Sequence, residues 1–229
     1  MLKKREASVF VVLAIIIAMV FVACDPGGSG NDDVIGETVN LDGIPVIIVD
    51  QTSSTDFSFD FVAGDITPLS SLFYGTPEVS VINNRLAISL DTPRSTALIS
   101  IIEFVEAVFQ VSYPDEHIDY LNPVDAKIWL PDRFAERTNF FNEDGSYSLT
   151  CLKSDQEFAF FMYADKEITI EGSRVFIGGH NQTVEVSMNI KQGWNYILWE
   201  ETGGQNNIIT YTVTNTLPNG YNWTVFKYN

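Results

Sequence analysis

Apolar and polar side chains alternate with a period of two through most of the second half of this chain. The alternation is regular over residues 168–171 and 184–190. It resumes after glycine- and asparagine-rich turn signals near residues 193, 204 and 220. A period of two is typical of β-strands with one buried face, and closely spaced turns are typical of antiparallel hairpins. The sequence therefore predicts a mostly β fold, an antiparallel β-sandwich-like domain whose last 50 residues form consecutive hairpins.

One segment follows a helical period instead. Over residues 95–110, apolar side chains recur three and four positions apart, with Glu103, Glu106 and Gln110 between them. Residues 91–93 or Ser95 supply the start signal, and Pro114 lies just beyond the end. We expect one α-helix over about 95–110, packed on the sheet. A buried strand is the alternative, because isoleucine, valine and phenylalanine also favour strands.

The N-terminus has the pattern of an export signal. Basic residues 3–5 precede an apolar run over residues 9–23, and Cys24 follows directly. The run is shorter than the about 20 residues that span a bilayer as a helix. This segment resembles the signals of bacterial lipoproteins, although Phe21 stands where that family usually has leucine. The resemblance implies cleavage before Cys24 and attachment of acyl chains to that cysteine. An uncleaved anchor and a secretory signal cut elsewhere are the alternatives.

The chain then divides into three parts. Residues 1–23 form the cleaved signal, and residues 24–37 form a flexible tether rich in glycine, aspartate and serine. Residues 38–229 form the β-rich globular domain. A subdivision near residues 113–123, an acidic loop with two prolines, is the alternative.

The charge excludes some partners. The chain has 13 basic and 30 acidic residues, and its net charge is −17. Removal of residues 1–23 takes away three basic residues and one acidic residue, which leaves a net charge of −19. Such a field opposes nucleic acid and anionic headgroups. The membrane contact must therefore be the lipid on Cys24, and the remaining partner is an unidentified protein or glycan.

A second resemblance lies in the β-rich half. Residues 163–172 and 186–195, which include an aromatic-Ala-Asp-basic strand and a Gly-Trp-Asn turn, are similar to uncharacterised envelope lipoproteins of spirochaetes. That family implies a β-domain in the cell envelope. It implies no activity and supplies no catalytic residues.

The sequence shows no spacing typical of a metal site or a catalytic motif, and its many acidic residues do not single out a pair. His117 and His180 are the only histidines and do not have zinc-site spacing. Residues 142–146 faintly resemble a calcium loop, but a hairpin turn is the better interpretation. No nucleophile elbow or phosphate-binding glycine loop is present. We expect no enzyme activity, no metal and no cofactor.

Two tryptophans and one cysteine complete the candidates. Trp194 is in phase with the apolar positions of its strand and is assigned to the core. Trp199 is out of phase with Trp194 and is the candidate exposed, ligand-binding aromatic. Cys151 lies in a strand-like run and is expected to be buried without a disulfide partner.

These observations predict a lipid-anchored, non-enzymatic protein of the bacterial envelope that presents a β-domain to an unidentified ligand. The alternatives are a lipid-anchored carbohydrate-binding protein or hydrolase, and a purely structural periplasmic component. We expect the outer membrane, with the domain facing the periplasm or the cell surface.

Overall fold

The structure is a computed structural model that describes residues 39–49, 57–58, 72–131, 138–142, 145–177, 181–203, 206–214 and 216–227. All of them belong to one compact unit, Val34–Asn229. The first strands and helices are β1 Val39–Ile48, β2 Phe57–Ser58, β3 Glu78–Ile82, β4 Arg85–Leu90, the 3-10 helix η3 Ser95–Ala97, β5 Ile99–Ser100, α3 Ile101–Phe109, β6 Tyr120–Asn122 and β7 Lys127–Trp129. The later strands are β8 Phe140–Phe141, β9 Tyr147–Ser154, β10 Glu157–Ala164, β11 Ile168–Phe176, β12 Asn181–Ile190, β13 Gly193–Thr202, β14 Asn206–Thr214 and β15 Asn222–Lys227.

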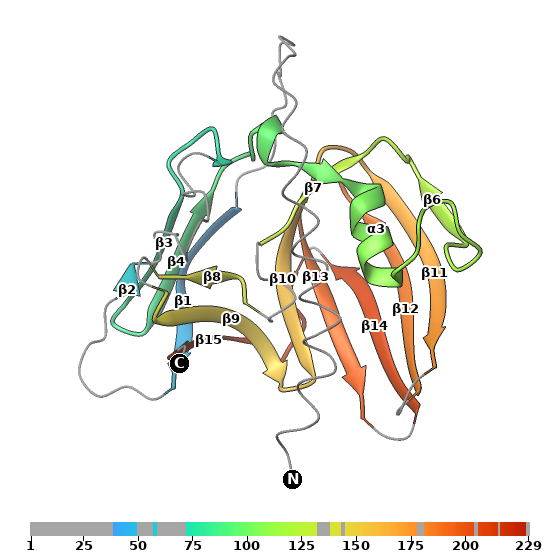
Figure 1. Cartoon of the computed structure of the whole chain (residues 1–229). Helices are drawn as coiled ribbons and strands as arrows, with labels where there is room; N and C mark the ends of the chain where they lie inside the picture. The colour runs from blue at the N-terminus through green and yellow to red at the C-terminus, as the bar shows by residue number, and fades with distance from the viewer. Residues whose placement is uncertain are drawn as a thin grey trace. The chain divides into compact units, whose positions relative to one another are not determined.

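The prediction of a mostly β fold with one α-helix is confirmed for the described residues (Figure 1). The strands form one 15-stranded sheet whose main path runs β2-β3-β4-β1-β15-β9-β10-β13-β14-β12-β11-β6. Most pairs are antiparallel, but β1 with β15 and β12 with β14 are parallel, so the sheet is mixed. The sandwich arrangement stays a prediction.

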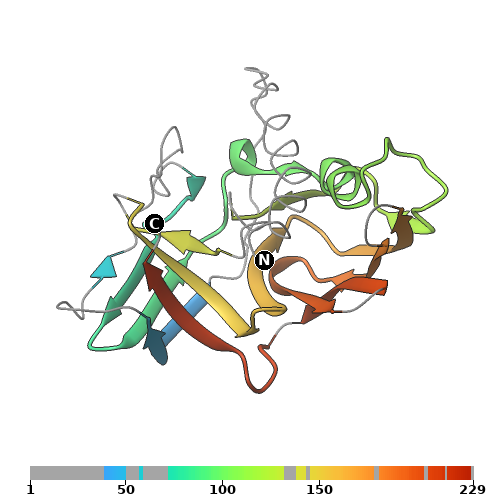
Figure 2. The ribbon, with the colours of Figure 1, turned by 60° about the horizontal axis from the view of Figure 1, so that its bottom comes forward.

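The expectation of consecutive hairpins at the C-terminal end is wrong at two points. Strands β11 and β12 form a hairpin, as do β13 and β14, but β14 lies between β12 and β13. Strand β15 then leaves this group and pairs with β9 and β1 (Figure 2). Alternation identifies a strand and its buried face, but it does not identify the strand's neighbours.

The helix is confirmed but is shorter than the predicted 95–110. It spans Ile101–Phe109, and the side chain of Ser100 accepts a hydrogen bond from the N–H of Ile102 at 3.2 Å, which is an N-cap. The residues before it form η3 and then β5, which pairs with β7. The helix ends where Gln110 adopts a left-handed conformation, φ 53°.

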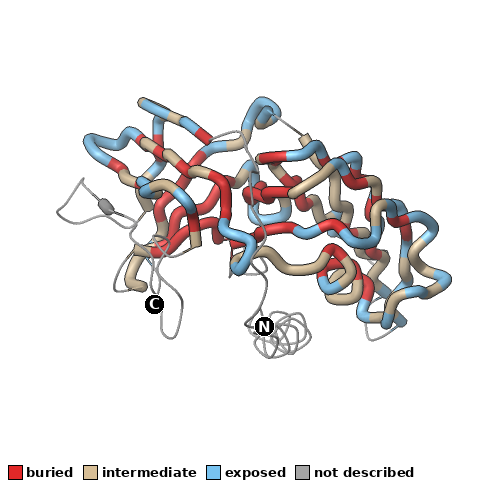
Figure 3. The backbone as a smooth tube through the Cα atoms, turned by 90° about the horizontal axis from the view of Figure 1, so that it is seen from above, coloured by how far each residue is buried: buried red, intermediate tan, exposed pale blue. Residues whose placement is uncertain are grey.

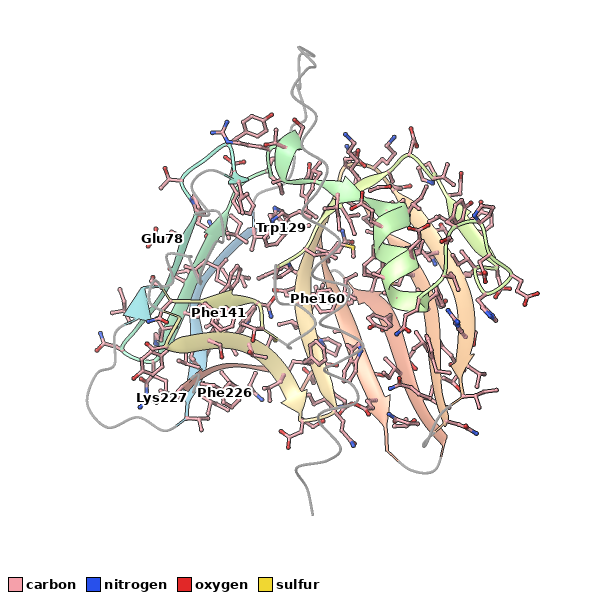
Figure 4. The ribbon with its side chains drawn as sticks, in the orientation of Figure 1. Glu78, Trp129, Phe141, Phe160, Phe226 and Lys227 are labelled. Carbon is pink, nitrogen blue, oxygen red and sulfur yellow. The ribbon has the colours of Figure 1, made fainter. Side chains whose placement is uncertain are left out.

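Two hydrophobic clusters occupy opposite faces of β10. Figure 3 shows that the buried residues lie mostly in the middle of the described backbone and the exposed residues mostly at its periphery. The first cluster, which we call the aromatic core, receives Phe161 and Tyr163 and also draws on β3, β4, β9, β13 and β15. The second, the helix-side core, receives Phe158 and Phe160 and lies against α3; Figure 4 labels Phe160. Both faces of β10 are therefore buried, which explains why its sequence is almost continuously apolar.

One buried side chain completes the backbone pairing of β10. Strand β9 pairs with β10 only as far as Ala159, and β7 pairs with it only from Tyr163. In the gap, the amide of Asn139 donates to the carbonyl of Ala159 at 2.8 Å and accepts from the N–H of Phe161 at 3.0 Å. Asn139 thus replaces a strand where β9 and β10 separate.

Candidate functional site

The lipid-attachment candidate lies outside the described residues. Cys24, the signal over 1–23 and the tether over 24–37 all precede the first described residue, and His180 falls in a later gap. In the described part of the chain, no helix is long and apolar enough to cross a membrane. The prediction for Cys24 therefore rests on the sequence.

The expectation that Trp199 is exposed is wrong. Its exposed fraction is 8%, and its ring centroid lies 4.6 Å from that of Phe158 in the helix-side core. Burial raises the pKa of Tyr211, its neighbour on β14, to about 12, while a hydrogen bond with Trp199 opposes this rise in part. Trp199 does point to the face opposite Trp194, but that face carries the helix-side core, and Trp199 is buried in it.

Trp194 belongs to the aromatic core, as predicted, although it is only partly buried. Its ring lies 5.5 Å from Trp129, labelled in Figure 4, and 5.5 Å from Tyr163, in edge-to-face contacts. The indole N–H of Trp194 and the hydroxyl of Tyr163 are buried without a hydrogen-bond partner. Burial raises the pKa of Tyr163; Thr92 is near enough to oppose this, but without the geometry of a formed hydrogen bond. The two polar groups therefore lie among aromatic rings, those of Trp129, Tyr163 and Trp194.

The other candidates have structural surroundings. Asn142 closes the turn between β8 and β9: Gly145 donates to its carbonyl at 2.9 Å, and the N–H of Tyr147 donates to its side chain at 2.7 Å. The hairpin interpretation of residues 142–146 is therefore confirmed at its described positions. His117 is half-buried, and its carbonyl accepts from the N–H of Ser173 at 3.0 Å. Within the described ranges, no group of three or more histidine, cysteine or acidic side chains is placed to hold a metal.

Cys151 is buried, as expected, and has no disulfide partner in the described part of the chain. Burial raises the pKa of its thiol to about 12. The thiol therefore stays protonated at neutral pH, and a protonated, enclosed thiol is a poor nucleophile.

One face of β11, β12 and β14 is an accessible polar surface. The alternate residues on the other side are buried in the helix-side core, so the remaining alternation points to solvent. We call this surface the polar face; every member is exposed or half-buried, and the members are Thr169, Glu171, Ser173, Thr183, Glu185, Ser187, Asn189, Thr210, Thr212 and Thr214. None of these side chains is basic, and most are hydroxyls.

A line of carboxylates crosses this surface. Glu185 on β12 lies opposite Thr210 on β14, which lies opposite Glu200 on β13, which lies opposite Glu157 on β10. Residues that are directly opposite share a face, and neighbouring strands are about 4.8 Å apart. At the end of the line, Lys153 bonds to Glu157 at 2.5 Å and holds the pKa of that carboxyl below its usual value.

Tyr221 lies beside this line of carboxylates. Its hydroxyl is buried without a partner, and burial raises its pKa, with further contributions from the charges of Glu200 and Glu157. A general acid at neutral pH needs a raised carboxyl pKa. Because the pKa of Glu157 is lowered, this carboxyl does not meet that requirement.

The sequence predicts which residues of each strand face solvent, but not that the strands lie side by side. The alternation of Glu185, Ser187 and Asn189 with apolar residues is visible in the sequence, and so is the alternation of Thr210 and Thr212. That these two sets share one surface depends on the parallel pairing of β12 with β14, for which the sequence has no local signal.

Comparisons with protein-family models, with curated proteins and with solved structures gave no match to this chain.

Proposed function

We propose that this chain is a lipid-anchored, non-enzymatic protein of a bacterial cell envelope. Cys24 carries the acyl chains, residues 24–37 act as the tether, and the β-domain, sandwich-like in its arrangement, presents the polar face to a partner. We place the anchor in the outer membrane, with the domain facing the periplasm or the surface.

The sequence supports the anchor. The order of a basic start, a short apolar run and Cys24 is that of a lipoprotein signal, and residues 163–172 and 186–195 resemble spirochaete envelope lipoproteins. Each buried methylene contributes about 0.8 kcal/mol, so several acyl chains together hold a protein firmly. The mature net charge of −19 opposes attachment to anionic headgroups, which leaves the lipid as the membrane contact.

The observation that carries the binding role is the polar face. Its members come from three strands, and they combine hydroxyls, which donate and accept hydrogen bonds, with the carboxylates of Glu171 and Glu185. A flat surface of such groups suits a polar or cationic partner.

A carbohydrate-binding role is the second candidate. Tyr196 is half-buried and lies opposite Thr214, so an aromatic ring borders the polar face on β13. Sugars are bound by this combination of an aromatic surface with hydroxyl and carboxylate hydrogen bonds.

The anchor is tested first. Cells that produce the wild-type chain are grown with radiolabelled palmitate and compared with cells that produce Cys24→Ala. We expect label and membrane association in the wild type alone. Protease treatment of intact and lysed cells then shows which way the domain faces. Equal membrane association of both chains, without label in either, would overturn the lipid anchor.

The binding role is tested by photo-crosslinking in the same cells. A benzoylphenylalanine is placed at Ser187 on the polar face or at Glu78 on β3, labelled in Figure 4, which is an exposed position on a distant strand. We expect a discrete adduct from position 187 and none from position 78. Adducts from neither position, or equally from both, would contradict a specific role for the polar face.

A further inference from the structure

Among the described residues, no strand pairs with the outer edge of β11 over its second half. Strand β6 pairs only with Thr169, Ile170 and Glu171, and β6 ends the path of the sheet (Figure 1). The N–H of Ser173 points to the same side, where it donates to the carbonyl of His117. Because backbone groups of residues two apart point the same way in a strand, the N–H and carbonyl of Val175 also point outward. No described strand pairs with them there.

The side chains at this edge are apolar and accessible. The exposed fractions are 55% for Val175 and 90% for Ile177. Strand edges that stay unpaired are usually protected by charged side chains, proline or a bulge. The nearby Arg174 gives no such protection, because its guanidinium donates to the carbonyls of Phe109 and Gln110 at the end of α3.

Carboxylates outnumber the one guanidinium, that of Arg174, among the charged side chains named at this edge. Glu185 lies directly opposite Ser173, and Glu171 lies two residues before it on the same face. On the outer side, the loop that contacts Ser173 through His117 carries Asp115 and Glu116. The polar face beside the edge contains no basic side chain. A second copy of this chain would bring the same negative field to the contact, whereas a basic segment would be attracted to it.

We propose that the outer edge of β11 at residues 175–177 binds an extended, basic segment of a partner protein as an added β-strand. The partner backbone pairs with the outward groups of Val175. Apolar partner side chains contact Val175 and Ile177, and lysine or arginine side chains lie near Glu171 and Glu185. Strand addition supplies affinity through main-chain hydrogen bonds and specificity through alternate side chains. This inference rests on the proposed binding role and names the partner's chemistry.

The test uses the full-length lipidated protein in dodecyl maltoside micelles and a fluorescent, acetylated nine-residue peptide. Its odd-numbered positions are lysine, lysine, valine, valine and lysine, with threonine between them, so that lysines and valines share the face that meets Val175 and Glu185. Binding is followed by fluorescence anisotropy. A second peptide of the same sequence is N-methylated at alternate residues, which removes hydrogen-bond donors on one edge and keeps the charge. We expect the N-methylated peptide to bind about tenfold more weakly, as loss of one to two hydrogen bonds implies.

Protein variants check the position of the contact. Val175→Pro removes an outward N–H that no described strand uses, and Val175→Lys adds a repelling charge. We expect each to weaken peptide binding by about tenfold or more. Ile47→Lys on β1 is the matched control, because the exposed fraction of Ile47 is 53%, close to that of Val175, and β1 is far from β11 in the sheet. Circular dichroism verifies that each variant folds.

The possible results distinguish strand pairing from charge attraction and from self-association. Equal affinity for the two peptides would show charge attraction without strand pairing and would overturn the proposal, as would no binding at all. A dimer in sedimentation velocity that Val175→Lys dissociates would assign the edge to a second copy instead. Because the peptide assay reads neither lipid attachment nor crosslinking from Ser187, its failure would leave the proposed function standing, and failure of the anchor would leave the peptide result intact.

Discussion

We expect Asn139→Ala to lower the free energy of unfolding more than any other substitution of a polar side chain in this protein that we consider. The side chain is 4% exposed and makes two hydrogen bonds to the backbone of β10, to Ala159 and to Phe161. Each such bond contributes about 0.5–1.5 kcal/mol, and each buried backbone group left without a partner costs about 1–3 kcal/mol. We therefore expect Asn139→Ala to lower the free energy of unfolding by about 2–5 kcal/mol, a large part of the about 5–15 kcal/mol typical of a domain.

The assay is urea unfolding monitored by tryptophan fluorescence. With an m-value of about 2 kcal/mol/M, a loss of about 3 kcal/mol lowers the urea midpoint by about 1.5 M. Asn189→Ala is the matched control, because Asn189 is exposed and only accepts a hydrogen bond from Thr169. We expect its effect to stay below about 0.5 kcal/mol.

A second variant separates the contribution of the amide's donor group from that of its acceptor oxygen. Asn139→Asp keeps an acceptor for the N–H of Phe161 but places a carboxylate against the carbonyl of Ala159 at neutral pH. We expect it to be as destabilising as Asn139→Ala at pH 7 and to recover stability as the pH falls and the new carboxyl becomes a donor. A change below about 1 kcal/mol for Asn139→Ala, with an unchanged m-value, would refute the view that this side chain replaces a strand.

Three further predictions concern other parts of the fold. The raised pKa of Cys151, about 12, means that the unfolded chain loses this proton at lower pH than the folded chain. Stability should therefore fall as the pH rises above 9, and Cys151→Ala should remove about 1 kcal/mol of that fall between pH 9 and 10 in urea titrations. Arg174→Ala should cost about 1–3 kcal/mol and raise amide exchange at the end of α3, with Arg174→Lys intermediate; unchanged exchange would contradict the capping role. Gly172→Ala would place a Cβ 2.4 Å from the carbonyl of His117, so its thermal midpoint should drop by several degrees, while Gly203→Ala, which meets only a flexible glutamine side chain, should melt like the wild type.

Alternation predicted the strands well where one face of the sheet is open. Thr183 to Ile190 follows the expected pattern throughout, with Val184, Val186 and Met188 buried. The polar residues between them are on the polar face because nothing in the described unit covers that side. Here the sequence pattern and the environment agree, residue by residue.

The same reasoning failed for Trp199 because a sheet in this fold can be covered on both sides. Being out of phase with Trp194 does place Trp199 on the opposite face, but that face is buried in the helix-side core, where Trp199 packs on Phe158. Whether a face is open depends on segments distant in the chain, and period-two reasoning has no access to such contacts. The predicted order of the C-terminal strands was wrong for a related reason. The parallel pairing of β12 with β14 joins two strands that no turn connects directly.

The role of Asn139 also had no signal in the sequence. It precedes two phenylalanines in a stretch without alternation, and a polar residue there is equally typical of a loop. Its importance comes from the separation of β9 and β10, which is a property of the assembled sheet. Buried polar residues of this kind can be recognised only once the backbone groups they satisfy are known.

The parallel pairing of β1 with β15 has a consequence for how the chain matures. Val46 lies opposite Trp223, so the first long strand meets this neighbour only once residue 223 has been made. A chain synthesised in order must hold one edge of β1 and one edge of β9 open until β15 emerges. Folding of this part of the sheet is therefore postponed until β15 has arrived, and a product truncated before β15 cannot complete the sheet.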